Sequence, residues 1–464
     1  MNTPTPACIM RTLLVGCGPI AHLAKGKGPV CGAEMSNVEE LVSPKGMGIL
    51  IENGIICQIS NEQELLEEYA PWVNKESIHS PTSSRNRPKL SEYTQQDGTR
   101  ILNLGGSAII PGLIDSHSHL LWAGDRSQES QWRAQGKSYA EIAQLGGGIG
   151  YTVAETRQSS KQDLLNLGID RLQTALRNGT TILEAKSGYG LTTESELLLL
   201  DAANELQKIS GLPALDLTWL GAHDTPPSAM DANLSRQSYV ESILSEQLPQ
   251  VLEQNIARSA DVFCEPGWFT IEETAEILTA SKKGGLDLRI HVDEFKDGGG
   301  LELAAEIEVT TADHAHYSSD DARQKAHDAG VMQGFLPGTP YVMGEESPPL
   351  LHCQNEGWMF SIATDYNPNC MTLSLPFIGS LAVNRGGLDP LAALVACTRN
   401  SGHTIANSSA KPHGMIVEGG IADLNILSSR QWQYWCLSPG DSPFAATMIA
   451  GELHKHNSIG GVTR

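Results

Sequence analysis

Between residues 110 and 403 the chain alternates short apolar runs with longer segments of helical periodicity, and this alternation constrains the fold more than any other feature. Segments such as ESELLLLDAANELQKI and IEETAEILTASKK place apolar residues three to four positions apart, as on an amphipathic helix. There are eight apolar runs: GLIDSHSH near 112, TTILEAKS near 180, LDLTWLGAH near 215, ADVFCE near 260, LDLRIHVDE near 286, VTTADHAH near 309, VMQGFLP near 331 and FSIATDYNP near 360. Eight β/α units predict an α/β fold with a (β/α)8 TIM barrel, whose active site lies at the carboxyl ends of the strands.

Both ends of the chain carry β-like segments outside this repeat. Residues 9–60 contain short apolar runs and the hairpin signal IENGII, which predict a small antiparallel sheet. Near the C-terminus the segments GMIVEGG, ADLNILSS and TMIAGEL have the same character, and we expect them to join the N-terminal sheet. The predicted organisation is a small β-sandwich domain made from residues 1–109 and 404–464, with the barrel formed by residues 110–403.

Composition restricts the partners and the compartment. The formal charge of -22, from 54 acidic and 32 basic residues, argues against nucleic acid or an anionic membrane surface as the main partner. The nine cysteines include no C-x-x-C pair and suit reduced thiols, and no run of about eighteen apolar residues occurs. We therefore expect a soluble cytoplasmic protein that binds neither nucleic acid nor membranes. The polar stretch 74–100 reads as an exposed excursion without an assigned role.

Residues 111–126 read PGLIDSHSHLLWAGDR and contain an H-x-H pair at the end of the first apolar run. Residues i and i+2 of a strand project to the same face, so His117 and His119 can converge on one ion. Histidines are also ordinary polar residues, and the pair indicates a metal only if further ligands follow.

Two later runs supply such ligands. The fifth run ends in HVDE with His291, and the eighth ends in ATDYNP with Asp365. Because the carboxyl ends of barrel strands meet at one face, these residues predict an N/N/N/O set that leaves room for a water.

Further residues at the same strand ends suit acid/base chemistry and charge stabilisation. Glu294 follows His291 by three positions and is placed to move protons near a metal-activated water. His314 could polarise a substrate carbonyl or amidine, and His316 points the same way by i+2 alternation. The residues alone leave this choice open.

Taken together, these motifs resemble the amidohydrolase superfamily and, within it, the imidazolonepropionase family. The resemblance covers nearly all of residues 11–427. It rests on PGLIDSHSHLLWAGDRSQE, SYAEIAQLGGGI, TILEAKSGYGL, LGAHDTPP, DVFCE, HVDE, ADH, LPGTPY, ATDYNPN, LSLP and MIVEGGIADL. The chain departs from the family pattern at HVDEF, FKDGGGLELAAE and DVFCEPGWF, and none of these departures removes a ligand.

The resemblance implies a TIM barrel of the metal-dependent hydrolase type that holds one divalent metal per chain, zinc or iron. The ligands would be His117, His119, His291 and Asp365, and Asp365 would also take part in catalysis. Glu294 would be the acid/base, and His314, rather than His316, the electrophile beside the metal. The implied reaction opens the ring of 4-imidazolone-5-propanoate to N-formimino-L-glutamate, the third step of histidine degradation, by metal-hydroxide attack on the ring carbonyl.

For the substrate, the resemblance implies a small molecule with a carboxylate tail held by Arg126, Tyr139, Tyr189, His223 and Asn367. A guanidinium suits a propionate because it offers a charge-assisted and potentially bidentate contact. The resemblance also implies a homodimer.

Alternative functions stay open at this point. A deaminase of an aromatic heterocycle uses the same H-x-H, H-x-x-E, H and D set, although a neutral base has no use for Arg126. Binuclear hydrolases of the superfamily typically bridge two metals with a modified lysine on strand four, whereas Lys186 lies on strand two and strand four ends in Cys264 and Glu265. One metal is therefore favoured, although Glu265 leaves an opening for a second ion. A non-catalytic barrel protein normally lacks ligands, and none is missing here.

Overall fold

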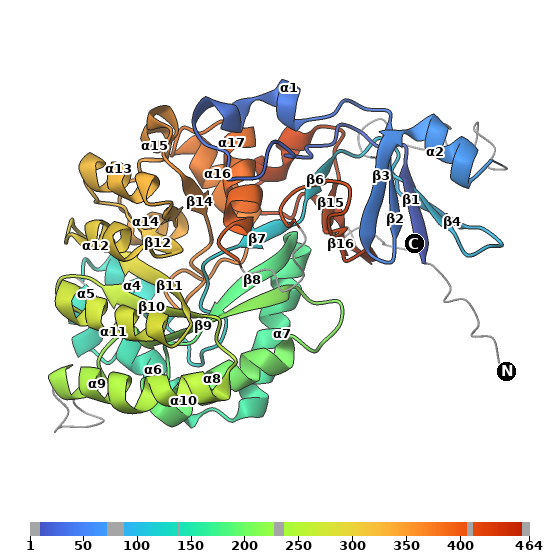
Figure 1. Cartoon of the computed structure of the whole chain (residues 1–464). Coiled ribbons are helices and arrows are strands. Elements are labelled where there is room, and N and C mark those ends of the chain that lie inside the picture. Colours follow the sequence, from blue (N-terminus) through green and yellow to red (C-terminus); the bar gives the residue numbers. More distant parts are fainter. Residues whose placement is uncertain (1–9, 72–87, 138, 227–235, 406–411, 457–464) are drawn as a thin grey trace.

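The computed structural model describes residues 10–71, 88–137, 139–226, 236–405 and 412–456, with a barrel and a smaller β-rich body beside it (Figure 1). Eight parallel strands form the barrel in chain order. They are β7 (Leu113–Asp115), β8 (Thr180–Lys186), β9 (Ala214–Ala222), β10 (Ser259–Cys264), β11 (Asp287–Val292), β12 (Thr311–His314), β13 (Met332–Phe335) and β14 (Phe360–Ile362). Each lies in one of the eight apolar runs, which confirms the predicted (β/α)8 barrel.

The first and last barrel strands are joined just beyond their carboxyl ends. Asp115 at the end of β7 accepts hydrogen bonds from the Thr364 backbone N–H at 2.9 Å and from its Oγ1 at 2.6 Å. One residue further, the Asp365 N–H donates to the His117 carbonyl at 3.1 Å, and the His119 N–H donates to the Tyr366 carbonyl at 2.8 Å. The segments that carry His117, His119 and Asp365 therefore form the seam at which the first and last barrel strands meet.

Amphipathic helices cover the outside of the barrel (Figure 1). In α7 (Lys161–Arg177), Ser160 and Asp163 form a capping box at the start, and Leu164, Leu172 and Ala175 are buried. The other helices of this layer are α8 (Thr193–Leu206), α10 (Leu248–Gln254), α11 (Ile271–Lys283), α12 (Gly300–Ile307), α13 (Asp320–Asp328), α15 (Leu350–Glu356), α16 (Leu375–Asn384) and α17 (Pro390–Val395). Shorter helices lie in the connections: α4 (Gln128–Ala134), α5 (Tyr139–Gln144), α6 (Gly148–Gln158), α9 (Arg236–Ser242) and α14 (Gly338–Met343).

The N-terminal segment forms a five-stranded sheet in the order β3-β2-β1-β5-β4. Its strands are β1 (Arg11–Val15), β2 (Met47–Glu52), β3 (Ile55–Asn61), β4 (Ser91–Thr94) and β5 (Arg100–Asn103), and α1 (Val38–Leu41) and α2 (Glu62–Tyr69) belong to the same segment. The predicted hairpin is confirmed, with Asn53 (φ 50°) and Gly54 (φ 80°) at its turn between β2 and β3. The sheet is mixed rather than antiparallel, because β1 pairs in parallel with β5.

The C-terminal strands form a second sheet, so the prediction that they join the first one is wrong. This sheet has the order β17-β16-β15-β6 and consists of β6 (Ile109–Pro111), β15 (Leu424–Leu427), β16 (Phe444–Ile449) and β17 (Glu452–Lys455). β1 is already paired on both edges, by β2 and β5, whereas β6 offers an edge to β15. The GMIVEGG segment forms turns in the described residues 412–456 rather than a strand.

The two sheets pack face to face and give the predicted β-sandwich from both chain ends. Their shared core is aliphatic and includes Leu14, Ile51, Ile109, Leu424 and Met448. The bounds of the barrel domain, residues 110 and 403, stay a prediction. Of the polar stretch 74–100, residues 74–87 lie outside the described residues.

Two further findings concern membrane spans and disulfides. Within the described ranges, no helix combines the length and apolar character needed to cross a bilayer. The eight described cysteines are all free thiols.

Candidate active site

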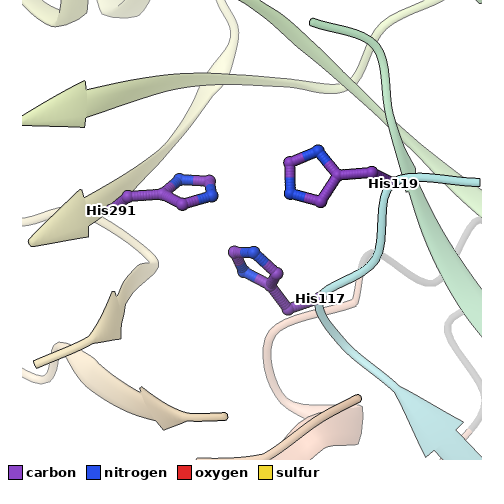
Figure 2. Close-up of side chains that lie close together, drawn as sticks. All are labelled: His117, His119 and His291. Carbon is purple, nitrogen blue, oxygen red and sulfur yellow. The ribbon is translucent and has the colours of Figure 1, made fainter. Parts of the chain in front are cut away.

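Three histidines from two distant strand ends converge inside the barrel mouth (Figure 2). His117 and His119 follow β7, and His291 lies on β11, and all three are at most 3% exposed. The His117 ring centroid lies 5.5 Å from that of His119 and 4.5 Å from that of His291. One ligand nitrogen from each histidine lies within 4.8 Å of the others, so a single ion can reach all three.

Asp365 lies beside this group, and with His117 and His314 it forms a second group whose ligand atoms lie within 4.8 Å of one another. Its Oδ1 lies 3.6 Å from His117 Nε2 and 3.7 Å from His119 Nε2. Ligand atoms in a tetrahedral zinc site with bonds of about 2.1 Å are roughly 3.4 Å apart, so these separations suit two ligands of one ion. Thr339 donates a hydrogen bond to Asp365 Oδ2 and leaves Oδ1 facing the histidines. Asp365 adopts φ 51°, a left-handed conformation of the kind found at functional sites.

The protonation of the histidines fits a divalent cation. Burial lowers the pKa of His117 and of His119 well below the usual value, so both rings are neutral and can act as ligands. His117 Nε2, His119 Nδ1 and His291 Nε2 are buried without a hydrogen-bond partner among the described residues. Buried polar atoms are normally satisfied, and an ion would satisfy those that face the centre of the group.

Two aspartates that we did not predict lie behind the histidines. His117 Nδ1 donates to Asp313 Oδ2 at 2.7 Å, and His291 Nδ1 donates to Asp261 Oδ1 at 3.1 Å. Such carboxylates fix the tautomer in which Nε2 carries the lone pair for the metal. Because both aspartates lie within apolar runs, a charged residue in a buried strand was the signal available in the sequence.

Glu294 and His314 lie side by side at the edge of the metal group. Glu294 Oε2 is 3.5 Å from His314 Nε2. Burial, followed by the charge of Asp365, raises the pKa of Glu294 well above its usual value, and burial lowers the pKa of His314 well below its usual value. Burial thus favours the uncharged form of both groups. A bound cation would favour the ionised form of Glu294, which can then accept a proton.

The two residues whose roles the sequence left open are placed by the structure. The His316 ring stacks on Tyr317, with centroids 4.5 Å apart; it does not line the cavity over the metal group but lines a smaller neighbouring cavity together with Glu294 and His314. Glu265 is 2% exposed and accepts a hydrogen bond from the Glu294 backbone N–H. Glu265 thus orients the loop that carries Glu294, and it belongs to neither of the potential metal groups found among the described residues.

One cavity joins these groups to most of the predicted substrate residues. Its lining is His119, Arg126, Ile149, Tyr189, His223, Phe263, Trp268, His291, Glu294, Phe295, His314, Thr339, Met343, Asp365, Asn367 and Asn369. Tyr139 begins α5, but its side chain lies outside the described part of the structure.

Arg126 is 6% exposed and is fixed by a glutamate that we did not predict. Its Nε donates to Glu129 Oε1 at 2.7 Å and its Nη2 donates to Glu129 Oε2 at 2.8 Å. Glu129 Oε1 also accepts the Gly148 N–H at 2.8 Å, which ties the start of α6 to the same pair. The i,i+3 spacing in DRSQE was the available sequence signal.

Tyr189 and His223 form the wall beside His119. The His223 ring stacks on His119, with centroids 5.0 Å apart, and meets Tyr189 edge-on at 5.1 Å. His223 Nδ1 donates to the Gly188 carbonyl at 2.9 Å, and burial lowers the pKa of His223 to about 3, so the ring stays neutral. Gly188 has φ 103°, and a Cβ there would lie 3.0 Å from His223 Nδ1, so the loop needs glycine at this position.

The side-chain amide of Asn367 forms hydrogen bonds within its own loop. Its Nδ2 donates to the Asp365 carbonyl at 2.8 Å, and its Oδ1 accepts the Asn369 N–H at 2.7 Å and the Cys370 N–H at 3.0 Å. Asn367 therefore shapes the segment that holds Asp365 as well as lining the cavity.

Comparisons with solved structures agree with this architecture. The ochratoxinase of A. niger superposes with a TM-score of 0.62 at 16% identity, covering 97% of each chain. An adenosine deaminase from Xanthomonas campestris with bound zinc gives a TM-score of 0.62 at 13% identity, covering 95% of this chain and 92% of that one. At these identities the likeness concerns the fold.

Similarity in sequence is more specific. An imidazolonepropionase of Symbiobacterium thermophilum is 39% identical over 420 residues, which make up 90% of this chain and 91% of that protein. An imidazolonepropionase of Haloarcula marismortui is 35% identical over 342 residues, or 73% of this chain and 79% of that protein. No family model matches the chain. These relatives establish that this chain belongs to the imidazolonepropionase family of hydrolases.

Proposed function

We propose that this enzyme hydrolyses 4-imidazolone-5-propanoate to N-formimino-L-glutamate. The carrying observation is that one cavity holds the metal group, Glu294 and the buried guanidinium of Arg126. The first two serve hydrolysis of a cyclic amide, and the third suits a substrate with an acidic tail.

The proposed cofactor is one divalent ion per chain, zinc or iron, held by His117, His119, His291 and Asp365. When bound, it supplies Lewis acidity that activates water and polarises a carbonyl. Three imidazoles and one carboxylate are ligands that both metals accept.

Glu294 and His314 have different proposed roles in the ring-opening reaction. Glu294 takes a proton from the attacking water and returns it to the ring nitrogen as the carbon–nitrogen bond breaks. His314, next to Glu294, stabilises the negative charge that develops on the carbonyl oxygen. The water oxygen thus becomes part of the new carboxylate, and the ring nitrogen leaves as the formimino group.

Arg126 is the proposed anchor for the propionate tail. Glu129 fixes its orientation before the substrate binds, so little entropy is lost on binding. Tyr189, His223, Asn367 and Tyr139 complete the proposed substrate site. A heterocycle deaminase is the alternative, and it is disfavoured because an arginine in the lining of the cavity suits an anionic substrate group better than a neutral base.

The test is the loss of imidazolonepropionate absorbance on adding metal-replete enzyme. We expect turnover by the wild type, almost none by Glu294→Gln, and a raised KM for Arg126→Met. Arg177→Met removes an exposed arginine on α7 and should behave as the wild type. An inert wild type that still binds about one ion per chain would contradict the substrate assignment and direct assays to heterocycle deamination.

The proposal extends to location and assembly. We infer a cytoplasmic enzyme, which the free thiols support, and a homodimer with a two-domain chain, as in the family resemblance. Fractionation and light scattering test these two points.

A further inference from the structure

The barrel interior directly below the metal group contains a buried lysine that the proposed reaction does not use. Lys186, at the end of β8, has a fully buried ammonium group. Its Nζ lies 2.6 Å from Asp261 Oδ2, 3.0 Å from Glu184 Oε1 and 3.8 Å from Asp313 Oδ2. A buried charge is costly unless it is paired, and these carboxylates on three strands pair with it.

Two of these carboxylates also accept hydrogen bonds from histidines that are proposed metal ligands. Asp261 accepts His291 Nδ1 on Oδ1 while its Oδ2 contacts Lys186. Asp313 Oδ2 accepts His117 Nδ1 and faces the same ammonium. Lys186 therefore lies at the centre of two carboxylate–histidine pairs that come from β10 with β11 and from β12 with the end of β7.

We propose that Lys186 is a positioning residue for the metal site: its ammonium fixes Asp261 and Asp313, and through them the ring orientations of His291 and His117. Without it, the two carboxylates would repel each other and turn away, since no other cation contacts both of them among the described residues. The same pairing keeps the lysine protonated, which disfavours its use as a modified lysine bridging two ions.

Arg289 provides a matched control in the same layer of the barrel. Its side chain is also fully buried, and it pairs with Glu184 at 3.0 Å and with Asp216 at 3.2 Å. Among the described residues it forms no ion pair with Asp261 or Asp313 and reaches Asp313 only through the Thr311 hydroxyl, so its loss removes an equal buried charge without breaking an ion pair of the histidine-bound carboxylates.

The inference rests on the proposed metal site, and its test measures metal binding rather than turnover. Apoprotein would be titrated with Co²⁺, the d–d absorption bands recorded, and Zn²⁺ affinity measured by competition with a chelator. We expect Lys186→Met to lower the affinity about 10- to 100-fold, the range for removing outer-shell partners of metal ligands, and to change the Co²⁺ spectrum. Arg289→Met should keep both near the wild type.

A charge-balanced variant separates positioning from stability. Lys186→Met/Glu184→Gln removes one charge of each sign, so it should unfold at higher temperature than Lys186→Met while still binding metal weakly. Wild-type affinity in this variant, or an equal loss in Arg289→Met, would overturn the inference. A wild-type protein that binds no ion would instead overturn the metal site itself.

Discussion

The two ends of the active-site cavity are built in different ways. The metal end is formed by residues at the ends of barrel strands. Asp313 and Asp261 on neighbouring strands accept hydrogen bonds from His117 and His291 of this end. The other end, called the carboxylate end because Arg126 is proposed to bind the substrate's carboxylate there, lies on the β7–α7 connection. Arg126 is held by Glu129 of α4 and, through Glu129, by the start of α6.

This difference separates chemistry from recognition. The metal ligands depend on the register of strands far apart in the chain, whereas Arg126 depends on a local unit of about twenty residues. Changes in the local unit should therefore alter substrate binding without disturbing the metal, and changes at the strand ends should stop the reaction.

The largest effect should come from the metal end. His291→Ala removes one ligand and leaves Asp261 without its imidazole partner. We expect bound metal to be lost and kcat/KM to fall on the order of 10⁴-fold, because several kcal/mol of charge stabilisation disappear. Metal analysis after dialysis, with turnover in excess Zn²⁺, checks this. A fully active His291→Ala variant would contradict the proposed dependence of the reaction on the metal end of the cavity.

The next effect separates the proton carrier from the ligands. Glu294→Gln should reduce kcat about 10³-fold, within the range for general acid/base groups, while the ion stays bound. Turnover and metal content measured on one preparation decide this, and Glu272→Gln, an exposed glutamate of α11, is the control. Loss of metal along with activity would make Glu294 a ligand instead.

A smaller effect is expected at the carboxylate end. Arg126→Met should raise KM about 10- to 100-fold, which corresponds to one or two charge-assisted hydrogen bonds, and change kcat little. Arg126→Lys should recover part of the loss, because an ammonium keeps the charge without the fork. If kcat falls as much as KM rises, Arg126 acts on the reacting atoms and the separation fails.

The smallest effect concerns pH and the Arg126–Glu129 pair. Burial alone would raise the pKa of Glu129, but the hydrogen bonds from Arg126 and Gly148 outweigh it and lower the pKa below its usual 4.5. A lowered folded-state pKa stabilises the protein above the unfolded-state pKa and stops doing so as pH falls through the folded-state value. The free energy of unfolding of Glu129→Gln should therefore be about 2 kcal/mol lower than that of the wild type at pH 7, and this difference should narrow below about pH 4.5. Urea unfolding of both proteins from about pH 3 to 8 measures the difference, and a difference that changes between pH 6 and 8 would contradict the prediction.

Much of this architecture was predictable because it repeats. Eight runs with polar ends predict a barrel and its active face, and His117, His119, His291 and Asp365 occupy that face. The contacts of Lys186 with Asp261 and Asp313 were not predicted, because they join residues of different strands that only the folded barrel brings together. The pairing of β15 with β6 was missed for the same reason, since edge availability depends on the folded sheet.

The seam that closes the barrel has a consequence for the order in which the site forms. His117 and Asp365 are joined by a backbone hydrogen bond, although the whole barrel separates them in the sequence. A chain emerging from the ribosome can present His117, His119 and His291 long before Asp365 exists. The proposed four-ligand site is therefore complete only after the eighth strand has been made and has closed against the first. A nascent chain would then retain the ion stably only after synthesis has passed residue 365 and the eighth strand has closed the barrel.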